Sequence, residues 1–151
     1  MPTVSLTGKD TISINGRILN DFADANVAEL TFENTLVNLK TGKNGNTIYG
    51  FNYSGRQCKV TLRLLRASAD DVFMNSLLLN LKNNPAGFTL MVGEFDKNIG
   101  DGQGNIHVDS YVLSGGTFDK ETDVKENADG DVEQAVAIYH LIFSNAPRAI
   151  S

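Results

Sequence analysis

The side chains best suited to acid–base or metal chemistry in this chain are its two histidines, His107 and His140. An imidazole can move a proton or bind a metal near neutral pH, but such a site also needs an acid, a base or a thiol at a workable spacing. Both histidines fall within alternating, strand-like segments, and the chain has no His-x-x-x-His or Cys-x-x-Cys pair. We therefore interpret both as ordinary strand residues.

Glycine-rich segments are the next candidates, because backbone amides in such loops can cradle a phosphate. Gly100–Asn105 lacks the Gly-x-Gly-x-x-Gly order of a dinucleotide-binding loop and joins two strands instead of opening a helix. It also lacks the acidic spacing and the terminal Glu of an EF-hand calcium site. Gly8-Lys9 and Gly42-Lys43 lack the earlier glycine and the following Ser or Thr of a P-loop. We interpret Gly100–Asn105 as a hairpin loop, with adventitious calcium binding as a minor alternative.

Paired carboxylates are explained by their positions. Asp70 and Asp71 fall at the start of a predicted helix, where the helix dipole favours negative charge. Asp129 and Asp131 fall in an acidic loop, where solvation explains them. No nucleophile, base and orienting acid combine in this sequence, so we expect a non-enzymatic protein with no cofactor and no metal site.

Composition narrows the class further. The chain has 13 Lys or Arg against 18 Asp or Glu, which gives a net charge of −5 and repels phosphate, so a nucleic-acid binder is disfavoured. The one cysteine, Cys58, cannot form an internal disulfide, and its apolar alternation predicts a buried thiol. We see no secretory signal and no apolar run near the roughly 20 residues of a membrane helix, so we expect a cytoplasmic, reducing environment.

One helix organises the rest of the chain, and we expect it at Ala69–Asn83. Ser68 is suited to cap it by accepting a hydrogen bond from the amide of Asp70 or Asp71, and Pro85 follows its end. Apolar residues recur at helical spacing and form one stripe, at Phe73, Met74, Leu77, Leu78 and Leu81.

The remaining segments have the alternation and turn signals of antiparallel strands. Asn15-Gly16 is a two-residue hairpin signal, and Gly115-Gly116 indicates a bulge or a close backbone approach. The longest alternation, Val132–Phe143, is apolar on both faces in its second half, which predicts cover on both sides. The other expected strands are Thr3–Leu6, Thr11–Ile14, Val27–Phe32, Leu36–Lys40, Thr47–Tyr53, Cys58–Leu64, Phe88–Phe95, Ile106–Leu113 and Thr117–Val124.

This pattern predicts one domain, residues 1–151, with a mainly β fold: an antiparallel β-sandwich or barrel with one flanking helix. The hairpin Leu36–Tyr53 is longer than a core requires, and its tip, Thr41–Asn46, is flexible and cationic. A plain surface loop is one interpretation of this hairpin, and an arm that reaches a neighbouring subunit is another.

Several segments, taken in order, resemble the tail tube proteins of tailed bacteriophages, most closely those with long contractile tails. They are Leu6–Arg17, Lys40–Asn46, Leu64–Asp71, Ile99–Asn105 and Phe143–Arg148. The resemblance covers nearly the whole chain and lies in the pattern and order of segments, since no single motif is diagnostic.

The resemblance implies a structural virion protein that polymerises as stacked hexameric rings into a hollow tube for DNA ejection. It implies a homo-oligomer that meets sheath, baseplate and tape-measure proteins and is assembled in the bacterial cytoplasm. DNA would pass through without specific binding, because an acidic wall repels phosphate.

Three sets of residues are candidates within that interpretation. The inter-subunit arm would use Lys40, Gly42, Lys43, Asn44, Gly45 and Asn46. The lumen would be lined by acids on the polar faces of strands, at Glu29, Glu33, Asp109, Glu121 and Glu133. Leu79 would be an exposed helix residue that touches a sheath, because Leu77, Leu78 and Leu81 already account for the inner stripe.

Three alternatives remain open at this stage. The tube could belong to a type VI secretion system or a bacteriocin (tailocin), which gene neighbours would decide. A small β-sandwich module that binds carbohydrate or another ligand is a different class, but such modules usually expose aromatic residues and this chain has no Trp. The third alternative, an enzyme, has no supporting constellation.

Overall fold

The computed structural model describes residues 5–6, 10–23, 27–126 and 128–151, and within them the protein is mainly β with one α-helix. The strands are β1 (Ser5–Leu6), β2 (Thr11–Ile14), β3 (Arg17–Ile18), β4 (Ala28–Thr31), β5 (Val37–Thr41), β6 (Thr47–Phe51), β7 (Cys58–Leu65), β8 (Met91–Gly100), β9 (Ile106–Asp123), β10 (Val136–Asn145) and β11 (Arg148–Ile150). The helices are α1 (Ala69–Asn83) and the 3-10 turns η1 (Tyr53–Arg56), η2 (Pro85–Gly87) and η3 (Val132–Ala135). Every strand pairing is antiparallel, so the predicted fold class is confirmed.

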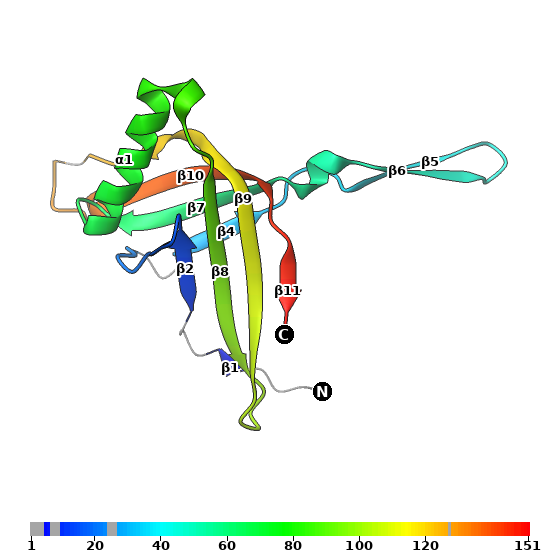
Figure 1. Ribbon diagram of the computed structural model, residues 1–151, viewed down its shortest axis with the longest axis horizontal. Coiled ribbons are helices and arrows are strands. Elements are labelled where there is room, and N and C mark those ends of the chain that lie inside the picture. The colour runs from blue at the N-terminus through cyan, green and yellow to red at the C-terminus, as the bar shows by residue number, and fades with distance from the viewer. Residues whose placement is uncertain (1–4, 7–9, 24–26, 127) are drawn as a thin grey trace.

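The main sheet turns back on itself along β9. The first half of β9 pairs with β8 and β11, and its second half pairs with β10. A register shift lies between these halves, where Gly115 has φ of +64°, so the bulge predicted at Gly115-Gly116 is confirmed. The bend divides the sheet into a first layer, β3-β2-β8-β9-β11, and a second layer, β9-β10-β7-β4, and the two cross in Figure 1.

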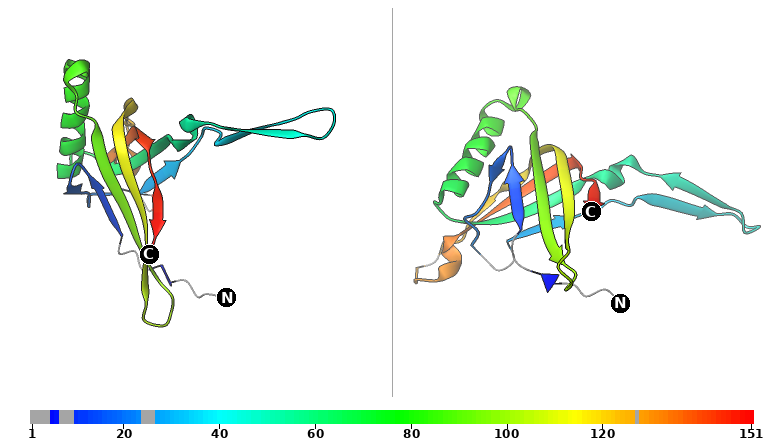
Figure 2. Two further views of the ribbon diagram at one scale, coloured as in Figure 1. Left: turned by 45° about the vertical axis from the view of Figure 1, so that its right-hand side comes forward. Right: turned by 60° about the horizontal axis from the view of Figure 1, so that its bottom comes forward.

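The core fills the space between these layers and under α1 (Figure 2). β7 and β10 alternate buried and half-buried residues along their pairing from Cys58 to Leu64, so one face of the second layer is continuously apolar. Cys58 is fully buried in this face, as predicted, and burial raises the pKa of its thiol to about 11. The largest fully buried side chains are Tyr139, Phe143, Ile14, Leu19, Leu62, Leu64, Met74, Met91, Leu113 and Leu141.

α1 begins and ends where the sequence predicts, at Ala69 and Asn83. Ser68 Oγ accepts the amide of Asp71 at 3.2 Å, which caps the helix. Met74 and Leu78 are buried, and Phe73, Leu77 and Leu81 pack against the core as partly buried residues, so the predicted apolar stripe is confirmed.

Asp70 ties the start of α1 to the segment after β3. Its carboxylate is 2% exposed and accepts the amides of Asn20 (2.7 Å) and Asp21 (2.8 Å) and the Nε–H of Arg17 (3.0 Å). Burial acts to raise the pKa of Asp70, but those amides and the guanidinium outweigh it and hold the pKa below its usual value. The carboxylate therefore satisfies two backbone donors that no strand partner reaches.

Several predicted strands differ from the structure in extent. The strand expected at Thr47–Tyr53 ends at Phe51, because Tyr53 begins η1. Val132–Ala135 was predicted as strand but forms η3, because the Asp131 side chain accepts the Glu133 amide and caps a 3-10 turn. The strand Phe88–Phe95 instead begins at Met91 and continues past Phe95 to Gly100, the first residue of the expected loop Gly100–Asn105. Its polar residues still pair with β9, because a backbone ladder does not depend on apolar side chains.

The two halves of β9, expected as separate strands Ile106–Leu113 and Thr117–Val124, form one strand across the bulge. The hairpin at Asn15-Gly16 is confirmed, with φ of 52° and 80°. Gly8, Lys9 and part of the expected strand Thr3–Leu6 lie outside the described residues.

Asp70→Asn tests the role of this carboxylate. We expect a loss of about 1–3 kcal/mol in the free energy of unfolding at pH 7, since two amides and a guanidinium lose their charged acceptor. The folded-state pKa is depressed, so the stabilisation is present above the unfolded pKa and disappears as pH falls through the folded one. Urea unfolding at pH 7 and pH 3 should therefore show a smaller difference between variant and wild type at pH 3. Asp129→Asn, in an exposed loop, is the matched control and should change neither value.

Candidate functional site

A two-stranded arm leaves the body of the protein. We define the arm as residues 36–56, which contain β5, β6 and η1. β5 and β6 pair with each other and form a sheet separate from the main one. Figures 1 and 2 show this hairpin extending away from both layers and from α1. The arm thus contributes no strand to the main sheet, and the predicted long hairpin is a projection.

The arm exposes apolar side chains along its length. Val37 pairs with Phe51 and Leu39 with Tyr49, so these four share one face of the hairpin. Leu39 is 60% exposed and Tyr49 72%. An isolated two-stranded hairpin is marginally stable in water, and apolar residues grouped on an exposed surface usually mark a contact site. The apolar side chains on this face are therefore exposed to solvent in the isolated chain.

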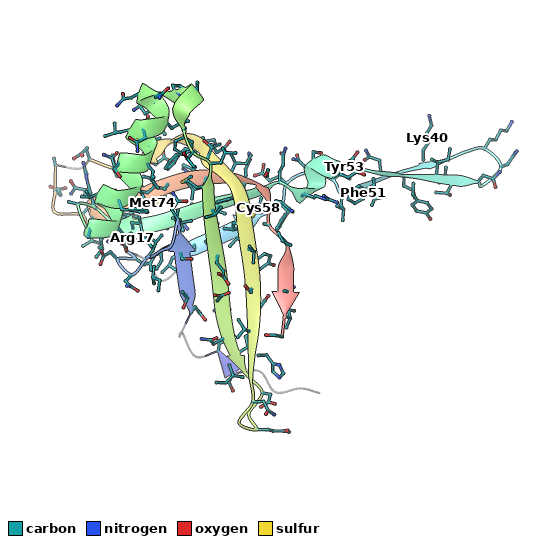
Figure 3. All side chains as sticks on the ribbon, viewed as in Figure 1. Arg17, Lys40, Phe51, Tyr53, Cys58 and Met74 are labelled. Carbon is teal, nitrogen blue, oxygen red and sulfur yellow. The ribbon has the colours of Figure 1, made fainter. Side chains whose placement is uncertain are left out.

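The root of the arm fixes its direction. Asn34 Nδ2 donates to Ser54 O (3.1 Å) and to Gln57 Oε1 (2.9 Å), bridging the two chains where they leave the body. The Arg56 guanidinium lies over the rings of Phe51 and Tyr53, at 5.7 and 5.2 Å from their centroids. These two rings meet edge-on at 5.1 Å, and Figure 3 labels both at the base of the hairpin.

The tip of the arm is the predicted Gly42–Asn46 turn. The Gly42 amide donates to Asn46 O at 2.7 Å, and Gly45 has φ of +84°. Lys40 precedes the turn on β5 and Lys43 lies within it, and both are exposed. The arm residues 36–56 include three cations and no acid, in a chain whose remaining residues hold ten Lys or Arg and 18 Asp or Glu. The arm is therefore a cationic projection on an anionic body.

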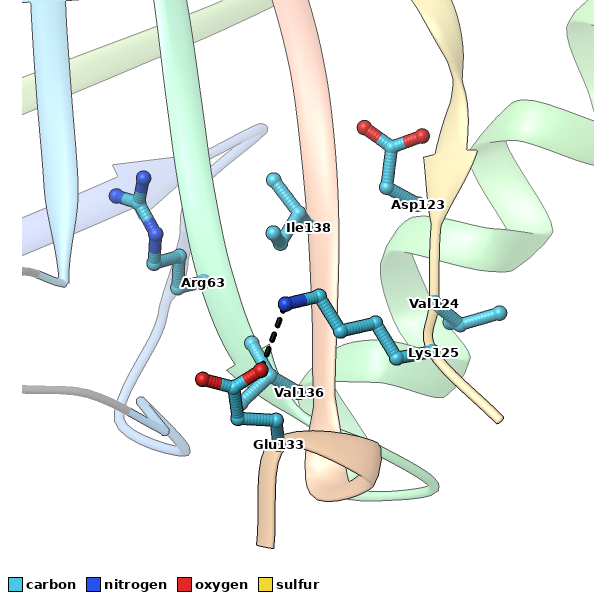
Figure 4. Close-up of a pocket in the computed structure, with 7 residues that line it drawn as sticks. All are labelled: Arg63, Asp123, Val124, Lys125, Glu133, Val136 and Ile138. Carbon is cyan, nitrogen blue, oxygen red and sulfur yellow. Dashed lines mark hydrogen bonds and ion pairs between the residues drawn. The ribbon is translucent and has the colours of Figure 1, made fainter. Parts of the chain in front are cut away.

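The second layer has one face turned away from the core, which we call the open face. Its half-buried aliphatic residues, Ile138 and Ile142, lie between charged side chains that pair with one another. Lys59 contacts Glu33 (3.0 Å) and Asp119 (3.7 Å). Figure 4 shows a shallow hollow at one end of this face, where Lys125 bonds Glu133 at 2.6 Å beside Ile138.

The histidines have different surroundings. His140 lies on the open face with Nε2 2.6 Å from Asp123 Oδ2, an acid partner that sequence spacing did not reveal because the bulged β9 brings it alongside. His107 Nδ1 lies 3.1 Å from the backbone oxygen of Ser151. Among the described residues, no group of three or more His, Cys, Asp or Glu side chains is arranged to hold a metal.

The five acids suggested for a lumen do not share one face. Glu29 and Glu33 border the open face on or just after β4, and Glu133 borders it from η3, which corrects its expected place on a strand. Asp109 forms a two-bond ion pair with Arg148, which lowers its pKa. Glu121 bonds Lys82 at the end of α1, which lowers its pKa as well.

Sequence reasoning found the tip of the arm but missed its apolar sides and root. The acid-free run from Asn34 to Ala69 was an available signal, since it spans the arm and β7 in an otherwise acidic chain. Leu79 is 44% exposed on α1, where the sequence predicted an exposed residue.

Comparison with models of known families and with curated proteins finds no match to this chain. Within the described part of the chain, no helix is both long and apolar enough to span a membrane.

Gly55→Ala tests whether the root fixes the direction of the arm. A Cβ at Gly55 would lie 2.8 Å from Leu36 Cα, so the two chains must separate, whereas a Cβ at Gly50 would meet Asn38 O at an ordinary 3.8 Å. We expect trypsin to cut Gly55→Ala several-fold faster at Lys40, Lys43 or Arg56 than wild type, while Gly50→Ala is cut at the wild-type rate. Equal rates for the two variants would contradict a fixed root.

Leu79→Lys tests whether Leu79 belongs to the core. Because this side chain is half exposed, the free energy of unfolding should change by no more than about 0.5 kcal/mol. Leu78→Lys is the matched comparison: Leu78 is 4% exposed, so a buried charge there should prevent folding. Circular dichroism and urea titration measure the folding and stability of both variants. If Leu79→Lys unfolds, Leu79 belongs to the core and is not an outer contact residue.

Proposed function

We propose that this protein is the structural subunit of a tail tube, which polymerises as stacked hexameric rings into a hollow conduit for phage DNA. The observation that carries the proposal is the arm. Its apolar face is exposed in the isolated chain, its direction is fixed at the root, and the hairpin extends away from the described body of the same molecule (Figure 2). A second copy of the chain supplies such a surface in a polymer.

The edges of the second layer support the same proposal. β4 pairs with β7 on one side only, and β9 beyond Gly116 pairs with β10 on one side only, among the described residues. These two edges bound a four-stranded sheet, β4-β7-β10-β9. An unpaired edge is a template for strand addition, so ring closure in which β4 of one copy meets β9 of the next would pair both edges.

The open face of this four-stranded sheet fits the wall of a conduit. Two of its cations, Lys59 and Lys125, are each paired with carboxylates of the same chain, and the chain as a whole is acidic. Paired cations bind phosphate poorly, because an incoming phosphate must displace a carboxylate already in place. In this proposal the open face lines the lumen, where it would let DNA slide without specific binding.

The proposal extends to partners by the same logic. The outward side of α1, with Leu79, would face a sheath, and the ends of the tube would meet baseplate and tape-measure proteins, with assembly in the host cytoplasm and a final place in the virion. A secretion-system or tailocin tube would use the same surfaces, and gene neighbours separate these cases.

Deleting Gly42–Asn46 tests the proposal directly. We expect a folded monomer that forms no rings or tubes, because the tip that reaches the next copy is gone. Negative-stain electron microscopy reads out assembly and circular dichroism reads out folding. Asn44→Ala keeps the length of the tip and should assemble like wild type. Tubes formed by the deletion variant would eliminate the arm as the connecting element.

A further inference from the structure

The first layer also has a face turned away from the core, and its exposed residues form a row across four strands. Ile18 pairs with Ser13, Ser13 with Glu94, and Glu94 with Val112, so the four point to one side of the sheet. Val92 lies two residues before Glu94 on the same face of β8. We call Ile18, Leu90, Val92, Glu94 and Val112 the β8 patch.

The aliphatic residues of the β8 patch are unusually accessible. Ile18, Leu90, Val92 and Val112 are each more than half exposed. Glu94, at the centre, and Asp96, two residues further along β8, form no ion pair with any described residue and accept only the Ser110 hydroxyl. The patch thus joins an apolar surface to negative charge that has no cation partner.

We propose that the β8 patch is the receiving surface for the arm of a second copy of this chain. This inference rests on the proposed function and adds the surface that the arm meets. It places the face bearing Leu39 and Tyr49 on the strand row of the neighbour.

The two surfaces match in size and form. The arm face is two strands wide and two residue pairs long, and neighbouring strands lie ~4.8 Å apart with same-face residues ~7 Å apart along a strand. The β8 patch spans the four strands β3, β2, β8 and β9, which gives room for a two-stranded hairpin laid against its side chains. Face-to-face packing of two sheets buries both apolar surfaces.

The charges match in sign as well. The arm has Lys43 in its tip and Arg56 at its root and no acid, while Lys40 lies on its opposite face. The patch has Glu94, with Asp96 beside it on β8, and neither acid has a cation partner among the described residues. Opposite charges at an interface speed association and fix its register. An arm from one copy and a patch from another make a heterologous contact, which repeats from copy to copy.

Other exposed surfaces fit the arm less well. On the open face, Ile138 and Ile142 are half-buried between acids that already have cations. On α1, Val72 and Leu79 are exposed, but the acids nearest in the helix, Asp70 and Asp71, accept hydrogen bonds from within the chain. Neither surface combines exposed aliphatic residues with acids that lack partners.

The test uses one variant in each half of the contact. Tyr49→Asp damages the arm and leaves the patch intact, and Val92→Asp damages the patch and leaves the arm intact. Val132→Asp is the matched control, because Val132 is an apolar residue 81% exposed on η3, away from both surfaces. Light scattering coupled to size exclusion measures assembly of the full-length chain, and circular dichroism measures folding.

We expect wild type and Val132→Asp to assemble, while Tyr49→Asp and Val92→Asp each stay monomeric. Mixed in equal amounts, the two defective variants should form a species of two chains, because an intact arm then meets an intact patch. Combining Lys43→Glu with Glu94→Lys in one chain should restore at least part of the assembly that either change alone abolishes.

The outcomes separate this inference from the proposed function. If Val92→Asp assembles like wild type, the β8 patch is not the receiving surface and the tube proposal stands. If wild type forms no assembly and the mixed variants form no pair, the tube proposal and the β8-patch inference are both wrong. If Val92→Asp changes the circular dichroism spectrum, Glu94→Lys, at an exposed position, takes its place in the test. We then expect Glu94→Lys to stay monomeric, and its assembly like wild type would rule out the β8 patch as the receiving surface.

Discussion

The close contact at Gly116 is the constraint on which the rest of the fold depends. A Cβ on this residue would lie 2.3 Å from the Phe143 ring and 3.0 Å from Met91 O, and at Gly115 a Cβ would meet Ser144 Oγ at 2.1 Å. Any larger residue at either position would have to displace these neighbours, so the two successive glycines let β9 pass between β8 and β10 and change layers. Without that passage the first and second layers would have no shared strand, and their apolar faces would not be turned toward each other.

The same bend explains why the protein has two exposed sheet faces. A β-sheet that folds over itself buries one face of each layer and leaves the other face of each outward. In a monomer such faces are usually polar, and here the open face follows that rule through its ion pairs. The β8 patch and the arm depart from it, which is why we propose assembly rather than a ligand site.

Much of the fold was predictable because its signals are local. The cap at Ser68, the apolar spacing of α1 and the Asn15-Gly16 turn depend on residues near one another in sequence, and each is confirmed. The extent of β8 and the 3-10 turn at Val132–Ala135 were not, because they depend on a distant strand partner and on a side-chain cap. For the candidate site, Lys40 and the tip were found by their length and charge. The arm's apolar face was missed, because alternation alone cannot tell whether a strand's apolar side has a core to meet.

The fully buried thiol of Cys58 has a practical consequence. Its sulfur sits in the apolar face of β7 with a raised pKa, so little thiolate forms near neutral pH and reagents have no access to it. No other cysteine exists in the chain. A cysteine introduced on an exposed strand or loop would therefore be the single reactive thiol of the molecule, so a fluorophore or spin label could be attached at one chosen point without first removing the native sulfur.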